Sequence, residues 1–168
     1  MMLFIHKLHQ LMTLINRCLV FVGAVALTAS AVILSYSVIS RAVFKAANDW
    51  QDEASLFCLL AATFLCTAYV QEIRGHIGIS AVASMLPKKI NRVRAVVIDI
   101  ASCLFCAFFA WKSWDLTSEA WVDGQITNST WGPPLWIPYS IMSIGMTLLA
   151  VQIFLQVFLP TAELERGH

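Results

Sequence analysis

The sequence predicts an all-α integral membrane protein with four transmembrane helices. Hydrophobic residues make up 59% of the 168 residues and charged residues only 12%, about half of the ~25% that soluble domains carry. Four long apolar segments alternate with short polar stretches. The length suits a single membrane domain over residues 1–168. A net charge of +1 gives no reason to expect a nucleic acid partner.

The first sixteen residues predict an N-terminal amphipathic helix lying in the membrane interface. Its apolar residues recur at helical spacing, and polar residues such as His6, Lys7 and Gln10 fall between them. This pattern is typical of helices that bury one face among the lipid headgroups. The apolar positions are Leu3, Phe4, Leu8, Leu11, Met12 and Ile15.

The first span is expected at about residues 18–40. Arg17 and Arg41 bracket twenty-three uncharged residues, which is long enough to cross a bilayer with some tilt. A secretory signal is an alternative, because Ala29-Ser30-Ala31 has the form of a cleavage site. The apolar run continues through Tyr36, which favours a span.

The second span is expected at about residues 51–73. Ala54 to Val70 is a run of seventeen residues without a charge, about 25 Å of helix. Trp50, Asp52 and Glu53 precede this run, and a polar stretch follows it. This length lies at the lower end of what the hydrocarbon core requires.

The third span is expected at about residues 95–114, after a basic turn that begins at Pro87. Asp99 is an acid inside this expected span, and a charge at the centre of a span costs about 3 kcal/mol. Its position four or five residues from the start of this expected span places it near the headgroups. Three interpretations remain open: a solvated acid, a carboxylate coupled to ion movement, or a contact with a partner subunit.

A polar loop is expected from Asp115 to Pro134, and the fourth span at about residues 135–159. Pro138 would fall in the first turn of that helix, where its missing N–H is harmless. No charged residue lies between Asp123 and Glu163.

The distribution of Lys and Arg predicts that both termini are cytoplasmic. With the N-terminus inside, eight of the eleven basic residues fall on the inner side and three on the outer side, which follows the positive-inside rule. The outer loops then carry six acids. The six tryptophans lie at or near this outer boundary, as in an aromatic belt.

The sequence offers little that could support catalysis, a cofactor or a metal. Cys103 and Cys106 have redox spacing, but thiols inside apolar helices lack the electropositive surroundings that favour thiolate. We therefore interpret the cysteines as small packing residues; Cys58, Ala62 and Cys66, at four-residue spacing, would let a neighbouring helix approach closely. The histidines lie outside the middle of the spans, which argues against a membrane haem.

The acids of the outer side are candidates for docking a partner. Asp52 and Glu53 at the start of the second span would also be stabilised by the helix N-terminus, by about 0.3–1 kcal/mol. Together with Trp50, Glu119 and Asp123, they form a hypothetical docking surface that is acidic and aromatic.

Taken in order, several short motifs make the chain resemble the small membrane subunit (DctQ type) of tripartite ATP-independent periplasmic, or TRAP, transporters. The resemblance covers about residues 17–159. One departure is Asp52, where the family more often has Glu, which conserves the charge. The motifs are Arg41 to Phe44, Trp50 with Asp52-Glu53, Arg74 to Ile77, Gly124, Pro134-x-Trp136-x-Pro138 and Gln152.

This resemblance implies a scaffold role without enzymatic activity. The small subunit would pair with a large multi-span membrane subunit that takes up an organic anion, such as a carboxylate, with sodium. A periplasmic substrate-binding protein would deliver that anion. Arg74 and His76 are then expected to anchor one end of the second span to lipid or to the partner, and Asp99 is a further candidate contact.

Two alternatives belong to other classes. A small multidrug exporter with four spans would carry an acid deep in its first span, and there is none between Arg17 and Arg41. A four-helix membrane thiol oxidoreductase would need cysteines in the 115–133 loop, and this loop has none.

Overall fold

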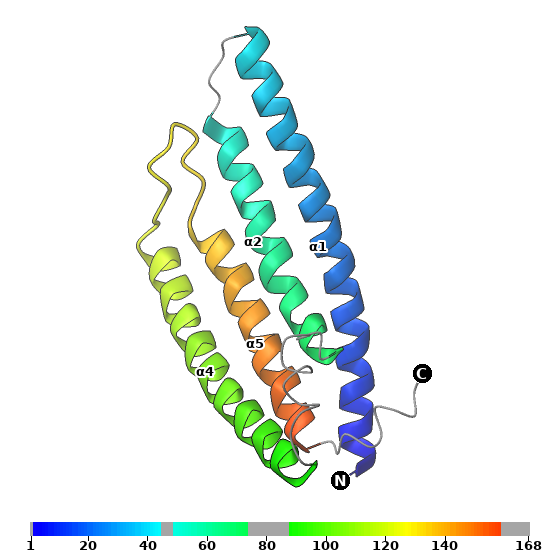
Figure 1. The fold of residues 1–168 in the computed structure, drawn as a ribbon. Coiled ribbons are helices and arrows are strands. Elements are labelled where there is room, and N and C mark those ends of the chain that lie inside the picture. The colour runs from blue at the N-terminus through cyan, green and yellow to red at the C-terminus, as the bar shows by residue number, and fades with distance from the viewer. Residues whose placement is uncertain (1, 45–48, 74–87, 159–168) are drawn as a thin grey trace.

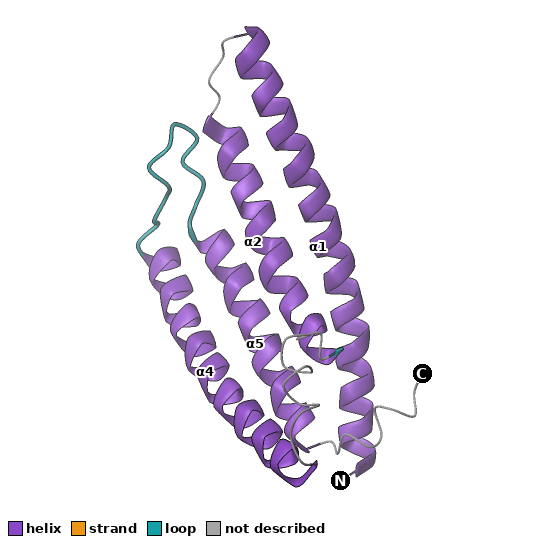
Figure 2. Cartoon of the chain, in the orientation of Figure 1, coloured by secondary structure: helices purple, strands orange, loops and turns teal. Residues whose placement is uncertain are grey.

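Four helices form a row in which each helix packs beside the next (Figure 1). The computed structural model describes residues 2–44, 49–73 and 88–158. Its elements are helical apart from the connecting loop between the last two helices (Figure 2). All four are long and apolar enough to cross a membrane, which confirms the predicted fold class. The helices are α1 (Met2–Phe44), α2 (Asp49–Glu72), α4 (Lys88–Val122) and α5 (Trp136–Phe158).

The order across the row is α1, α2, α5, α4. α1 packs along α2, α2 packs along α5, and α5 packs along α4, while α1 touches α5 only slightly. We call the end that holds the start of α1 and the end of α2 the Glu72 end, and the opposite one the Asp52 end (Figure 1). Because the helices form a row and not a closed ring, the described helices do not surround a central passage.

The residues expected to form an interfacial helix, 1–16, continue directly into the first span. α1 runs without interruption from Met2 to Phe44, and its apolar part extends over Leu11–Val43. The stretch around Arg17 contains no Gly or Pro that would end a helix. The amphipathic N-terminal residues are therefore the first turns of the long helix α1.

The third helix is also longer at both ends than expected. α4 begins at Lys88 and ends at Val122, so Asp115 and Glu119, assigned to the polar loop, lie on the helix. Asp99 is eleven residues from its start, not four or five. Helix formers such as Leu116 and Ala120 follow Asp115, and the first residue that favours another conformation is Gly124.

α4 ends in a glycine cap. Gly124 has a φ of 60°, and the N–H of Gln125 donates to the carbonyl of Ala120 at 3.1 Å, as in a Schellman motif. The loop that follows is held by an isolated antiparallel bridge between Ile126 and Pro134. Its backbone hydrogen bonds give the connection between α4 and α5 a defined shape.

Two glycines allow the helices to approach closely. A Cβ on Gly23 of α1 would lie 2.6 Å from Cys66 Sγ of α2, and one on Gly145 of α5 would lie 2.5 Å from the carbonyl oxygen of Phe64 of α2. The contact of Gly23 with Ala62 and Cys66 confirms that these small residues allow close approach. The main apolar core lies between α4 and α5, around Cys106, Ala110, Met146 and Ile153.

Candidate functional site: the two ends of the helix row

The Glu72 end contains a buried polar cluster that joins three helices. The Glu72 carboxylate of α2 accepts hydrogen bonds from Thr13 Oγ1 and Asn16 Nδ2 of α1, each at 2.7 Å. Asn16 Nδ2 also donates to Gln152 Oε1 of α5 at 3.3 Å. Asn16 and Gln152 are fully buried. A polar cluster in a membrane protein fixes how its helices are aligned, because few other polar partners exist there.

The carboxylate sets the direction of this chain of hydrogen bonds. A carboxylate can only accept hydrogen bonds, so Asn16 must turn its NH₂ group toward Glu72. The same NH₂ group faces Gln152, which must then present its oxygen. Asn16 Oδ1 and Gln152 Nε2 are left buried without a hydrogen-bond partner among the described residues, which costs about 1–3 kcal/mol per group.

A second pair of amides connects α2 and α5 at the same end. Gln71 Nε2 donates to Gln156 Oε1 at 2.9 Å, and Gln156 Nε2 donates to the backbone carbonyl of Gln71 at 2.9 Å. That carbonyl lies in the last turn of α2, where backbone acceptors lack partners within the helix. Gln156 therefore acts as a cap for α2.

At the Asp52 end, α1 and α2 share an ion pair. Arg41 of α1 contacts the carboxylate of Asp52 of α2, and Ser37 Oγ donates to the same carboxylate at 3.4 Å. The two charged side chains are 46% and 50% exposed. Such exposed pairs contribute about 0–1 kcal/mol, so this pair orients Asp52 more than it stabilises the fold.

Two neighbours of Asp52 have unsatisfied polar atoms. Gln51 is almost fully buried, and in the part of the chain that the structure describes neither its amide nitrogen nor its amide oxygen has a hydrogen-bond partner. Glu53 is half-buried with Oε2 unpaired. Trp50 is 45% exposed. The beginning of α2 thus combines an exposed aromatic ring with acids that are partly engaged inside the chain.

Tryptophans surround the Asp52 end of α4 and α5. The rings of Trp121 and Trp136 meet edge to face at 4.8 Å, and Trp114 Nε1 donates to Thr147 Oγ1 at 3.1 Å. Trp111 lies under the Lys112 ammonium group, 4.7 Å from the ring centroid. Aromatic rings with polar handles are typical of the membrane interface.

The structure separates the predicted site residues into several groups. Asp52 and Glu53 lie together on the first turn of α2, whereas Glu119 and Asp123 are exposed near the end of α4. Asp99 is half-buried on α4. Arg74 and His76 lie outside the described residues.

Sequence reasoning missed the cluster at the Glu72 end. Glu72 was seen only as part of the polar stretch after the second span, and Asn16 only as part of the interfacial helix. A signal was present, because Gln152 and Gln156 lie one helical turn apart in an otherwise apolar segment. Paired amides in a span indicate a contact between helices.

The cysteines form no disulfide, and Cys103 Sγ lies 3.8 Å from the carbonyl oxygen of Ala150 in a packing contact. Within the described ranges, no three His, Cys, Asp or Glu residues come together as a metal site.

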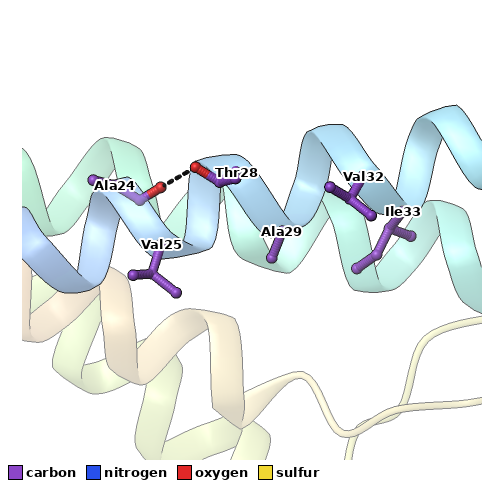
Figure 3. A pocket seen from close by; sticks show the side chains of 6 residues that line it. All are labelled: Ala24, Val25, Thr28, Ala29, Val32 and Ile33. Atoms are coloured by element: carbon purple, nitrogen blue, oxygen red, sulfur yellow. Dashed lines mark hydrogen bonds between the residues drawn. The ribbon is translucent and has the colours of Figure 1, made fainter.

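A hollow on α1 illustrates that the outer surface of the row is apolar. Its lining comes from one helix, from Ala24 to Ile33, and is almost entirely apolar (Figure 3). The hydroxyl of Thr28 donates to the carbonyl of Ala24 at 2.9 Å within the same helix. Val32 in its lining and Phe21 nearby on α1 are large apolar side chains that are exposed. Lipid or another membrane protein must cover such a surface.

These features define a multi-pass membrane protein whose described polar groups link its helices to one another. The chain belongs to the family described as tripartite ATP-independent periplasmic transporters, DctQ component, whose pattern it matches over residues 30–162.

A related protein is also named as a TRAP transporter permease. The chain is 23% identical over 112 residues to the isethionate TRAP transporter permease protein DctMQ of Oleidesulfovibrio alaskensis. The match covers 64% of this chain and 17% of that protein. The chain therefore corresponds to a small part of the length of this relative.

Proposed function

We propose that this chain is the small permease subunit of a TRAP transporter and acts as a static scaffold for a large membrane subunit. The family match over residues 30–162 supports this proposal, as does the name of the DctMQ relative. The main structural support is the open row of helices, which surrounds no passage in the described part of the chain.

The composition of the described spans also supports a scaffold. α2 carries no charge from Ala54 to Gln71, and the buried polar groups are mostly neutral Ser, Asn and Gln side chains that contact neighbouring helices. Sites for anions and sodium in transporters are usually built from broken helices near the middle of the bilayer. The four described helices are each continuous, so we assign those sites to the large subunit.

The transported compound is proposed to be an organic anion, such as a carboxylate, taken up with sodium and delivered by a periplasmic binding protein. The chain would reside in the cytoplasmic membrane of a bacterium or archaeon with both termini in the cytoplasm, as the basic residues suggest. The Asp52 end would then face the periplasm. Its exposed Trp50, Glu119 and Asp123 are the proposed contacts for the binding protein.

Co-purification and uptake test this proposal together. The tagged chain is expressed with a large TRAP subunit from the same source and purified in detergent, and the two are expected to elute as one complex. Vesicles with both subunits and a matching binding protein should take up an organic anion when a sodium gradient is applied. If the large subunit never co-purifies and transports equally well without this chain, the scaffold role is wrong.

A further inference from the structure

A lateral groove runs between α2 and α4, with α5 as its floor. Its volume is about 360 Å³, and ten residues line it. α2 and α4 both pack on α5 and make few contacts with each other, so among the described helices the groove is open to the outside of the row. The lining residues are Ala62, Thr63, Cys66, Thr67, Val70, Gln71, Ser102, Cys106, Leu149 and Ile153.

The groove has the length of one leaflet of a bilayer. Gln71 lies beside Glu72, the acid that ends the charge-free part of α2, so it marks one edge of the hydrocarbon core. Ala62 is nine residues further into the membrane, which is about 14 Å along a helix. Half of a hydrocarbon core of ~30 Å is about 15 Å. The groove therefore extends from the membrane edge to about the bilayer midplane.

The polar groups of the lining are used differently along that distance. Gln71 and Ser102 lie at the Glu72 end of the groove, whereas Ala62, Cys106 and Leu149 lie deeper. The deeper hydroxyls of Thr63 and Thr67 donate to the backbone carbonyls of Leu59 and Phe64 within α2. Ser102 places a hydroxyl at the Glu72 end of the groove. This arrangement matches a phospholipid, whose ester groups lie at the hydrocarbon edge and whose acyl chains extend toward the midplane.

The start of α4, at the Glu72 end of the row, is rich in basic residues. α4 begins with Lys88, Lys89, Arg92 and Arg94, and the first acid after them is Asp99. The Glu72 carboxylate is directed toward Thr13 and Asn16 of α1 and not toward α4. Basic clusters next to the end of a membrane helix attract anionic headgroups.

The hollow on α1 provides a contrast. It is larger, at about 520 Å³, but it is formed by a single helix and is almost entirely apolar. The hydroxyl of its Thr28 is already bonded within α1 (Figure 3). The groove therefore differs from the hollow on α1 in more than its volume. It has walls from three helices, a polar end and basic residues at the adjacent start of α4.

We propose that the groove between α2 and α4 binds one anionic phospholipid from the leaflet at the Glu72 end. An acyl chain fills the groove along Leu149 and Ile153, the ester region lies at Ser102, and the headgroup faces the basic start of α4. The lipid covers an apolar surface that the row of four helices leaves open.

Native mass spectrometry of the full chain tests this site. The protein is purified in detergent, delipidated, and titrated with phosphatidylglycerol or phosphatidylcholine of the same acyl chains. One phosphatidylglycerol should be retained in preference to phosphatidylcholine. Neutralising the four basic residues of α4 to Gln should reduce this preference, by about fivefold for each charge near the headgroup. Equal retention of the two lipids by the unaltered chain would overturn the proposal.

Variants that fill the groove locate the lipid. Ser102→Phe and Thr67→Phe fill it from opposite walls, and each should abolish the retained adduct. Thr28→Phe fills the α1 hollow and should leave the adduct unchanged. Measurements of helical content and monodispersity identify a variant that fails to fold. If one groove variant fails to fold, the other one tests whether the lipid occupies the groove. Retention of the adduct in a folded groove variant would contradict the site. A second result would also contradict the site. If the unaltered chain retains no lipid and Ser102→Phe abolishes binding of the large subunit, a helix of that subunit occupies the groove.

Discussion

The two ends of the helix row are built differently. At the Glu72 end, Asn16, Glu72 and Gln152 connect α1, α2 and α5 through buried hydrogen bonds. At the Asp52 end, α1 and α2 share a half-exposed ion pair between Arg41 and Asp52. Buried contacts of this kind fix how helices align, whereas exposed ion pairs contribute little. The Glu72 end therefore carries the more extensive polar cluster between α1, α2 and α5, and the Asp52 end has side chains available for other proteins.

The largest expected effect on stability comes from substituting a glycine at a close contact between helices, in the part of the row between its two ends. Gly145→Ala places a Cβ against the backbone of Phe64, which cannot move without separating α2 from α5. We expect a loss of about 3 kcal/mol or more in the free energy of unfolding, measured by thermal or denaturant unfolding in detergent.

Gly23→Ala provides a matched control. Its Cβ would meet the Cys66 side chain and not backbone at close range, so the double variant Gly23→Ala with Cys66→Ala should recover most of the stability. Cys66→Ala should not rescue Gly145→Ala. If Gly145→Ala and Gly23→Ala reduce the free energy of unfolding by the same amount, these contacts do not limit the spacing between the helices.

The buried cluster at the Glu72 end should produce the next largest effect. Glu72→Ala removes the acceptor of two hydrogen bonds and leaves the Asn16 NH₂ group with only its longer bond to Gln152. We expect the free energy of unfolding to fall by about 2 kcal/mol. Glu72→Gln retains an oxygen that can accept one of these bonds and should cost less.

A double-mutant cycle between Asn16→Ala and Glu72→Ala sharpens this prediction. The two changes should be less costly together than the sum of the single effects, because they remove the same hydrogen bond. Strict additivity would mean that the bond does not stabilise the fold.

The ion pair at the Asp52 end should matter little for stability. Asp52→Asn with Arg41→Gln is expected to reduce the free energy of unfolding by about 0.5 kcal/mol, and the loss should shrink at high salt. A loss as large as that of Glu72→Ala would break the contrast between the two ends.

The smallest effect on stability is expected for the exposed acids Glu119 and Asp123. Reversing both to Lys should leave unfolding within about 0.5 kcal/mol of the unaltered chain, because neither side chain is buried. If these acids form the proposed docking surface, the same variant should weaken binding of the periplasmic protein to the complex. Unchanged binding in a surface-based assay would remove Glu119 and Asp123 from that surface.

The sequence was sufficient for the fold class, because runs such as Ala54 to Val70 can satisfy their backbone hydrogen bonds in a membrane only as helices. It was insufficient for helix ends. Arg17 suggested a boundary, yet α1 continues through it, since a single basic residue does not stop a helix. Asp115 suggested a loop, yet α4 continues to Val122, where Gly124 ends it.

The sequence did not show which polar residues form hydrogen bonds with one another. Thr13 and Glu72 are fifty-nine residues apart and Asn16 and Gln152 are one hundred and thirty-six apart, and their meeting depends on the order of helices in the row. The resemblance identified the family because it rested on several motifs in order. It did not show that Asp52, one of those motif residues, is paired with Arg41 inside the chain.

The most direct test of the scaffold account compares three sets of vesicles: this chain alone, a large TRAP subunit alone, and both together. Each set receives the binding protein, an organic anion and a sodium gradient. The account predicts no uptake by this chain alone and the highest uptake by the pair. Sodium-driven uptake by this chain alone would contradict it.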